Sequence, residues 1–179
     1  ETNAHTQRVA YYSKLLARAY GLDDSLQDII FYASPFHDLG KIGIPDNILL
    51  KPGKLDAAEF EIMKKHSQIG YEILKGAKSK YLKAGGVIAY YHHEKYDGSG
   101  YPNGLKGESI PIFGRITAIA DVFDALTSAR PYKKAWEIED AFDFLIKEKG
   151  IHFDPKLVDL FLENKNEVLE IEKEIESGI

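Results

Sequence analysis

Cysteine is absent from the 179 residues of this chain. Its absence excludes disulfides, thiolate metal ligands and thiol nucleophiles, and it fits a cytoplasmic location. No apolar run approaches the roughly 18 residues of a membrane span, and no signal peptide is visible. Acidic residues outnumber basic ones by 28 to 23, which gives a formal net charge of −5. We therefore expect neither a membrane segment nor a DNA or RNA partner, because nucleic-acid-binding domains are usually basic.

The length fits a single domain, which we expect to span residues 1–179 and to bury roughly 70% of its unfolded surface. Apolar residues make up 44% of the chain and charged residues 28%, as in ordinary globular domains. The sequence starts at Glu1 rather than at methionine. We therefore expect the C-terminal part of a longer protein, with a regulatory domain upstream.

The apolar spacing is helical, and no segment shows a convincing period of two. Residues 40–54 carry three glycines and two prolines and are expected to form a long connection, and residues 94–113 a loop. Loops of about twenty residues in compact domains are usually functional. The pattern predicts an all-α fold, with a last helix that is charged and solvated. The expected helices cover residues 3–20, a segment from Asp23 or Asp24 towards His37, a segment from Asp56 past His66, and residues 81–93, 114–128, 137–149, 155–163 and 164–177.

Histidine and aspartate recur along the chain in a pattern that suggests a metal site. Imidazoles and carboxylates bind first-row divalent ions without help from cysteine. Each residue alone has an ordinary explanation, such as a helix cap or a buried ion pair for Asp121. However, unliganded imidazoles at His92 and His93 would be costly to bury behind an apolar segment. Together the residues predict a polynuclear metal site, and the two oxygens of Asp38 suit it to bridge two ions. The candidate ligands are His5, His37, Asp38, His66, His92, His93 and Asp121.

Glu1 is a candidate ligand for a third ion. It precedes His5 by four residues, so the two share a face if the segment is helical. Glu1, Asp38 and Asp121 contribute three negative charges, and three divalent ions would leave a surplus suited to phosphate. The alternative is an ordinary solvated first turn.

Three motifs carry a resemblance to a known family. They are His37-Asp38 with Lys41 and Pro45, His92-His93-Glu94 followed by Asp97-Gly-Ser-Gly100-Tyr101-Pro102, and the run from Ile119 through Asp121 and Asp124 to Arg130 and Lys133. Their order and spacing closely resemble the HD-GYP domain, a branch of the HD-domain metal-dependent phosphohydrolases. The resemblance spans residues 1 to about 155 and leaves 156–179 as C-terminal helices.

The resemblance implies an HD-domain helical bundle with a five-helix core and additional helices. It also implies a bacterial phosphodiesterase that hydrolyses cyclic di-GMP to linear pGpG, with a metal-bridging hydroxide as the nucleophile, and leaves open whether pGpG is cleaved onward to GMP. Position by position, the seven candidate residues match the family's metal ligands, with Asp38 bridging. Glu1 resembles the extra ligand of trinuclear members. The expected cofactors are two or three divalent ions, iron or manganese, with three favoured because of Glu1.

The same resemblance assigns catalytic and substrate-binding roles. Lys41, three residues after Asp38, would act with Asp38 in catalysis by stabilising charge or assisting the leaving group, unless it is a solvated loop lysine. The expected substrate-binding residues are Arg130, Lys133, Asp124, Tyr101 and Gly100. Several alternatives stay open, because Arg130 and Lys133 would also suit a solvated basic turn, Tyr101 would also pack the loop, and Asp124 would also orient a ligand.

Two other functions remain open from the sequence. The first is a signalling module whose 94–113 loop contacts diguanylate cyclases, and the second is a di-iron oxidase on the same scaffold. The basic residues Arg130 and Lys133, together with Glu1, favour phosphate chemistry over oxygen activation. The sequence leaves homodimerisation, the metal's identity and activity on other cyclic dinucleotides undecided.

Overall fold

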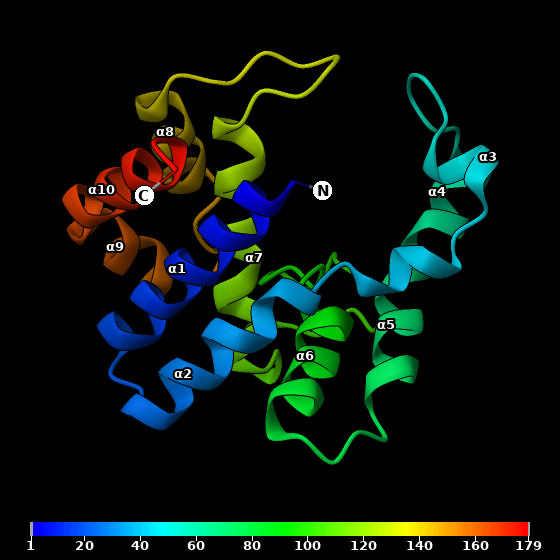
Figure 1. The fold of residues 1–179 in the computed structure, drawn as a ribbon, viewed down its shortest axis with the longest axis horizontal. Helices are drawn as coiled ribbons and strands as arrows, with labels where there is room; N and C mark the ends of the chain where they lie inside the picture. The colour runs from blue at the N-terminus through cyan, green and yellow to red at the C-terminus, as the bar shows by residue number, and fades with distance from the viewer. Residues whose placement is uncertain (1, 179) are drawn as a thin grey trace.

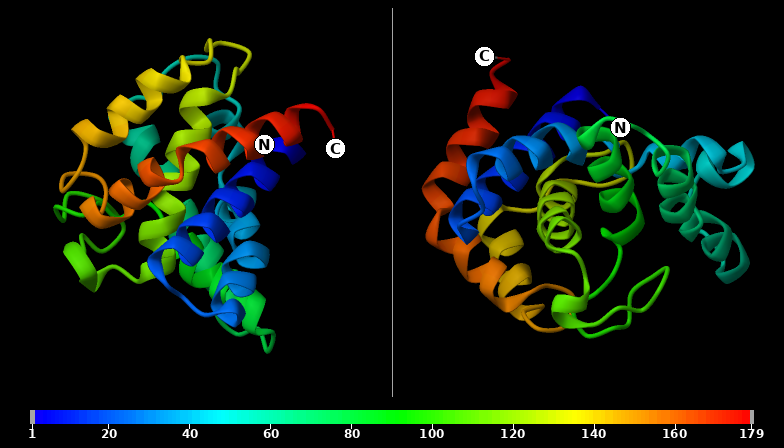
Figure 2. Two further views of the ribbon diagram at one scale, coloured as in Figure 1. Left: turned by 90° about the vertical axis from the view of Figure 1, so that its left-hand side faces the viewer. Right: turned by 90° about the horizontal axis from the view of Figure 1, so that it is seen from below.

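The computed structural model describes residues 2–178 and is almost entirely helical, as the apolar spacing predicted. Within that range, extended pairing is limited to isolated bridges such as Arg130 with Lys133. No helix of this range is long and apolar enough to cross a membrane. Figures 1 and 2 show the arrangement of the helices. The α-helices are α1 (Asn3–Tyr20), α2 (Asp24–Ala33), α3 (Asp46–Leu49), α4 (Ala57–Lys64), α5 (His66–Leu74), α6 (Lys80–Tyr91), α7 (Ile112–Thr127), α8 (Ile138–Lys147), α9 (Pro155–Glu163) and α10 (Lys165–Glu176).

Local signals in the sequence set several helix ends. Asp23 caps α2 by accepting a hydrogen bond from the Leu26 amide, and Asp56 caps α4 by accepting one from the Glu59 amide. Gly21 ends α1 in a left-handed conformation, with φ at 98°. These caps match the predicted boundaries closely.

The core surrounds α7, which runs through the middle of the molecule and is seen nearly end-on in the right-hand view of Figure 2. Its Phe123 contacts three other buried rings, those of Tyr12, Phe142 and Phe161, with centroid distances of 4.9 to 5.5 Å. Burial of such rings supplies much of the driving force for folding. The packing therefore fixes α1, α8 and α9 against α7, the helix that carries Asp121.

The structure corrects three expectations about local structure. The 40–54 connection begins within a 3₁₀ turn, Leu39–Gly43, and contains the short helix α3. The helix expected to run past His66 is divided at Lys65 into α4 and α5. The charged C-terminal helix is not wholly solvated, because Val168 is fully buried against the core. Tertiary contacts decide these features, and propensity does not report them.

Candidate metal centre

Seven predicted ligands from separate parts of the chain meet in two adjoining groups. One group holds Asp38, His66, His92 and His93, and the other holds His5, His37 and Asp121. Within each group the potential ligand atoms lie within 4.8 Å of one another. The residues come from α1, α5, the end of α6, α7 and the turn that follows α2. Glu1, the eighth candidate, lies outside the described residues.

Hydrogen bonds orient most of these imidazoles from behind. The Nδ1 atoms of three of them lie 2.7 to 3.0 Å from carbonyl oxygens: His37 from Ser34, His66 from Met63, and His92 from Ile88. A carbonyl oxygen only accepts hydrogen bonds, so Nδ1 carries the hydrogen and the lone pair of a neutral ring sits on Nε2. The backbone therefore selects the tautomer that ligates through Nε2.

Asp38 lies between the two groups. Its Oδ1 is 3.2 Å from His66 Nε2 and 3.4 Å from His92 Nε2, whereas its Oδ2 is 3.3 Å from His37 Nε2. Asp121 Oδ1 is 3.3 Å from the same His37 nitrogen and 3.6 Å from His5 Nε2. The two oxygens of Asp38 thus face different groups, which is the geometry that a bridging carboxylate needs.

The site favours positive charge between its carboxylates. Burial lowers the pKa of His37, but the carboxylates of Asp121 and Asp38 outweigh this and raise that pKa well above its ordinary value. Burial raises the pKa of Asp121, but the charge and hydrogen bond of His37 outweigh it, so this pKa falls below the usual range. The negative charges of Asp121 and Asp38 therefore stabilise a proton on His37. The same charges would stabilise a metal cation bound at this position.

The imidazole of His93 is in the opposite situation. Burial, followed by the charges of His92 and His66, lowers the pKa of His93 well below its ordinary value. His93 Nε2 lies 3.1 Å from His66 Nε2. The buried Nε2 of His92 has no hydrogen-bond partner among the described residues. Converging nitrogen lone pairs and carboxylates, without sulfur, form a donor set that fits divalent first-row ions. The cluster is therefore arranged to bind divalent metal.

Asp124 supports the cluster from outside the ligand set. It is fully buried, its Oδ2 lies 2.5 Å from His5 Nδ1, and its Oδ1 accepts a hydrogen bond from Arg8 Nε. Arg8 also donates to Ser128 Oγ at 2.8 Å. A carboxylate behind a ligating imidazole fixes the ring and raises its basicity. The structure thus places Asp124, predicted to contact substrate or to orient a ligand, in contact with His5 and Arg8.

The 94–113 loop packs against the cluster. The Tyr101 ring stacks on His93, with centroids 4.8 Å apart and planes at 16°. A Cβ on Gly100 would lie 2.3 Å from Lys95 N and 2.5 Å from His93 O, so only glycine fits there. The structure therefore places both residues, predicted to bind substrate, against the segment that carries His93.

Glu94 and Gly40 belong to the motifs, but no role was predicted for them from the sequence. Both hold the site together. Glu94 is buried and accepts hydrogen bonds from the amides of Asn103 (2.7 Å) and Leu105 (3.0 Å), which folds the 94–113 loop back on itself. A Cβ on Gly40 would lie 1.8 Å from His66 O, so its absence lets the Asp38 segment approach α5. A charged residue inside a Gly-rich motif was the available signal for Glu94.

A cavity of about 660 Å³ opens beside the second ligand group. Its walls come from the start of α1, from Asp38 and Lys41, from Leu49 and Leu50 at the C-terminal end of α3, and from residues 124 and 128–131 around the end of α7. Lys41 Nζ lies 2.9 Å from Asp38 Oδ2, and Arg130 lines the same cavity. Lys133 instead donates to Ala125 O at 3.3 Å and lies over the ring of Trp136.

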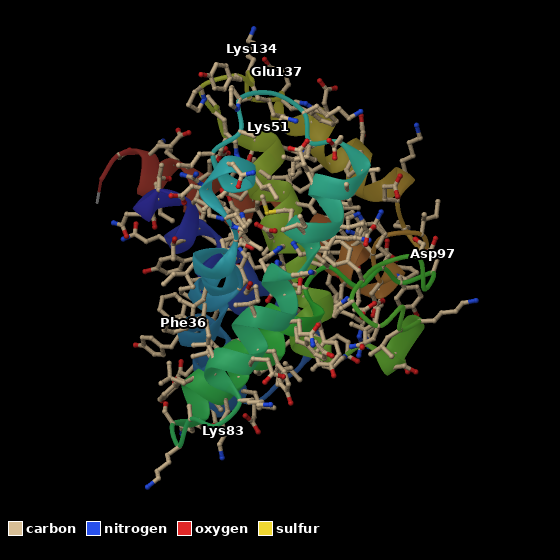
Figure 3. All side chains as sticks on the ribbon, turned by 90° about the vertical axis from the view of Figure 1, so that its right-hand side faces the viewer. Phe36, Lys51, Lys83, Asp97, Lys134 and Glu137 are labelled. Carbon is tan, nitrogen blue, oxygen red and sulfur yellow. The ribbon has the colours of Figure 1, made fainter. Side chains whose placement is uncertain are left out.

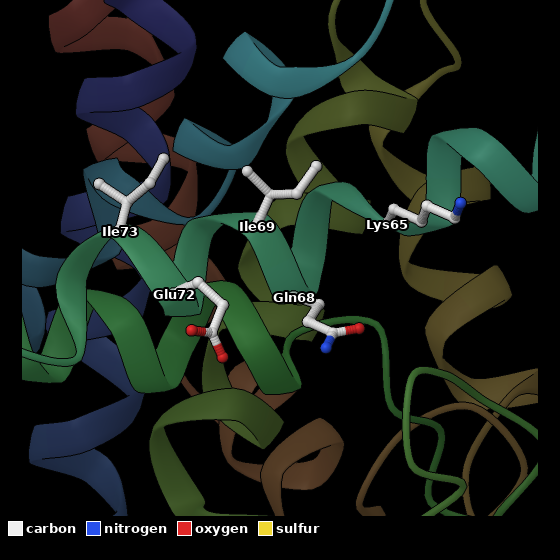
Figure 4. Close-up of a pocket in the computed structure, with 5 residues that line it drawn as sticks. All are labelled: Lys65, Gln68, Ile69, Glu72 and Ile73. Carbon is white, nitrogen blue, oxygen red and sulfur yellow. The ribbon is translucent and has the colours of Figure 1, made fainter.

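A second hollow lies along the outer face of α5 and is shown in Figure 4. Lys65, Gln68, Ile69, Glu72 and Ile73 line it. None of these residues belongs to the predicted site. The cavity beside the metal cluster is therefore the better candidate for a substrate site.

Comparison with known proteins agrees with this geometry. The family model of the HD domain matches residues 1–157. The chain is 56% identical over 171 residues to the 3′3′-cGAMP-specific phosphodiesterase 2 of Vibrio cholerae, covering 96% of this chain and 33% of that protein. It is 49% identical over 170 residues to the cyclic di-GMP phosphodiesterase response regulator RpfG of Xanthomonas campestris, covering 95% of this chain and 45% of that protein.

A solved structure shares the fold. The crystal structure of a cyclic GMP-AMP-specific phosphodiesterase of V. cholerae superposes with a TM-score of 0.71 at 18% identity, covering 96% of this chain and 48% of that chain. The chain spans between a third and a half of the length of these proteins. The predicted HD-type helical bundle is confirmed.

Proposed function

The chain belongs to the HD-domain family, and from this membership we propose that it is a metal-dependent phosphodiesterase acting on cyclic di-GMP in bacterial second-messenger signalling. It would yield linear pGpG and then GMP. One observation carries the proposal: His and Asp side chains from five separate segments converge, with most of their imidazoles held so that Nε2 points inward. The names of relatives at 56% and 49% identity support a cyclic dinucleotide as substrate.

We assign the metal ligands as His5, His37, Asp38, His66, His92, His93 and Asp121. Bound divalent ions would supply an activated water as nucleophile and withdraw charge from the phosphate. The two oxygens of Asp38 would serve neighbouring ions. Iron or manganese suits the nitrogen and oxygen donor set. We favour three ions because Glu1 resembles the extra ligand of trinuclear family members, and Glu1→Gln should then reduce the metal content measured by elemental analysis from three ions to two.

Lys41 and Arg130 supply the positive charge that the reaction needs. Lys41 Nζ lies 2.9 Å from Asp38 Oδ2, at the wall between the metal cluster and the cavity. As the bond from phosphorus to the ribose 3′ oxygen breaks, Lys41 would stabilise charge on the leaving oxygen. Arg130 would hold a phosphate oxygen of the substrate in the same cavity. The Lys133 side chain contacts Ala125 and Trp136, and its backbone pairs with that of Arg130, so we assign it a role in holding the loop after α7.

Hydrolysis by anaerobically loaded protein tests this proposal. Cyclic di-GMP should disappear with formation of pGpG, and His92→Ala should abolish both turnover and bound metal. His152→Gln is the matched control, because His152 lies outside both ligand groups. Intact cyclic di-GMP after hours with fully loaded wild-type protein would refute the activity, and full metal content in the His92 variant would refute its role.

The docking function of the 94–113 loop finds less support. That alternative relied on Gly100 and Tyr101 as contacts for a diguanylate cyclase. The Tyr101 ring stacks on His93, and Gly100 packs against the backbone of residues 93–95. Substitution of either residue should therefore disturb the metal centre more directly than any contact with a partner protein.

A further inference from the structure

The cavity beside the metal cluster has one wall that the phosphate chemistry leaves unused. Leu49 and Leu50, at the C-terminal end of α3, face the same cavity as Lys41 and Arg130. We refer to these two leucines as the apolar ledge. Leu50 is 71% exposed, and Leu49 is half-buried.

The segment that carries the ledge is anchored by two buried isoleucines. They are Ile44, just before α3, and Ile48 within it, which are 4% and 5% exposed. Anchoring through these residues leaves Leu49 and Leu50 for the cavity. Figure 1 shows α3 standing away from the helical core, and Figure 3 places Lys51, just after the ledge, at the same end of the molecule as Lys134 in the loop after α7.

A single exposed leucine needs no explanation. Two adjacent leucines on the wall of a cavity that also opens onto Asp38 are different, because a bound substrate would remove them from water. Of the groups in a cyclic dinucleotide, only the purine rings present large faces without charge. The cavity volume of about 660 Å³ lies within the range that holds small ligands.

We propose that the apolar ledge binds the face of one purine base of the substrate while the metal side of the cavity holds the phosphates. This inference rests on the proposed phosphodiesterase function. Leucine side chains carry no hydrogen-bonding group, so the ledge senses the base's flat surface and not its edge. It therefore contributes equally to binding of guanine and adenine, and discrimination between cyclic di-GMP and 3′3′-cGAMP lies elsewhere in the cavity.

Leu50→Ser tests the proposal, with Ile42→Ser as matched control. Ile42 is 78% exposed on the neighbouring turn but does not line the cavity. For the Leu50 variant we expect KM to rise about tenfold for both cyclic di-GMP and 3′3′-cGAMP, since removing part of a leucine contact is worth about one decade of affinity. Its kcat/KM for cyclic di-GMP should fall by a similar factor relative to that for bis(p-nitrophenyl) phosphate, a diester without purines. The Ile42 variant should match wild type.

Equilibrium binding of a non-hydrolysable phosphorothioate analogue of cyclic di-GMP separates this inference from the proposed function. If wild type binds the analogue but hydrolyses neither dinucleotide, the proposed function fails, and the dissociation constants of the two variants still test the ledge. An unchanged KM and Kd in Leu50→Ser overturns the ledge. So does an equal loss of activity towards bis(p-nitrophenyl) phosphate, or an effect confined to one of the two dinucleotides.

Discussion

The buried carboxylate of Asp124 offers the sharpest test of how the site is held. Replacing it with asparagine keeps the shape but removes the charge opposite Arg8 and the strong acceptor behind His5. Asp124 is fully buried and Arg8 is only 8% exposed, so solvent cannot replace the lost interaction. Breaking one partner of such a buried pair costs about 3–5 kcal/mol of unfolding free energy. Loss of the carboxylate behind a ligating imidazole weakens metal binding about 10- to 100-fold.

Urea unfolding of metal-free Asp124→Asn, compared with wild type, measures the first effect. Titration of the same two proteins with manganese measures the second. Asp28→Asn serves as the control, because Asp28 Oδ1 lies 3.1 Å from Lys14 Nζ in an exposed ion pair. Such a pair contributes at most about 1 kcal/mol to the free energy of unfolding. Our reasoning would be wrong if the Asp124 variant kept both its unfolding free energy and its manganese affinity at the control's values.

Further predictions concern Gly100, the side-chain carboxyl of Glu172 in α10, and the bound metal. Gly100→Ala should lower Tm and bound metal, because its Cβ would collide with backbone atoms, whereas Gly76→Ala should change neither, having nothing within 4 Å of its added carbon; equal behaviour of the two variants would count against the loop's role. Burial and then Glu176 raise the pKa of Glu172 to about 7 from 4.5. The folded protein therefore holds a proton on Glu172 more tightly than the unfolded chain does. The resulting stabilisation is complete below pH 4.5 and is lost as the pH rises through 7. Because glutamine stays uncharged, Glu172→Gln should raise Tm over that of wild type more at pH 8 than at pH 5. The exposed Glu174→Gln is the control, and a parallel pH dependence of the Glu172 variant and wild type would contradict the assignment. Removing metal with a chelator should lower Tm reversibly, since one ion at a thousand times its Kd adds about 4 kcal/mol; an unchanged thermal transition would argue against metal binding by the folded state.

The pattern of the sequence was sufficient for much of the fold. Helical spacing of apolar residues and local caps such as Asp23 and Asp56 specify where most helices begin, because these signals act within one turn. The division of the helix at Lys65 and the burial of Val168 were missed. Both depend on which distant residues pack nearby, and this information is not contained in a local window.

The candidate site, too, could be predicted from the sequence only in part. The types and order of the seven candidate ligands could be read from the chain, because donor chemistry is a property of each side chain. Their tautomers could not be read, since carbonyl oxygens of the preceding turn select the Nε2 form of His37, His66 and His92. Gly100 and Tyr101 were expected at the substrate, with loop packing as the alternative for Tyr101, and only the structure identified the His93 segment as the surface on which both pack.

By itself, the sequence determined the helical class, the absence of sulfur ligands and the set of His and Asp side chains available to metal. These properties follow from composition and from periodicity over a few residues. Only the tertiary structure decided that Asp38 lies between two ligand groups, that Asp124 stands behind His5, and that the apolar ledge shares a cavity with Lys41. The physical reason is that such contacts join residues far apart in the chain, and their geometry is set by packing of the whole core around α7.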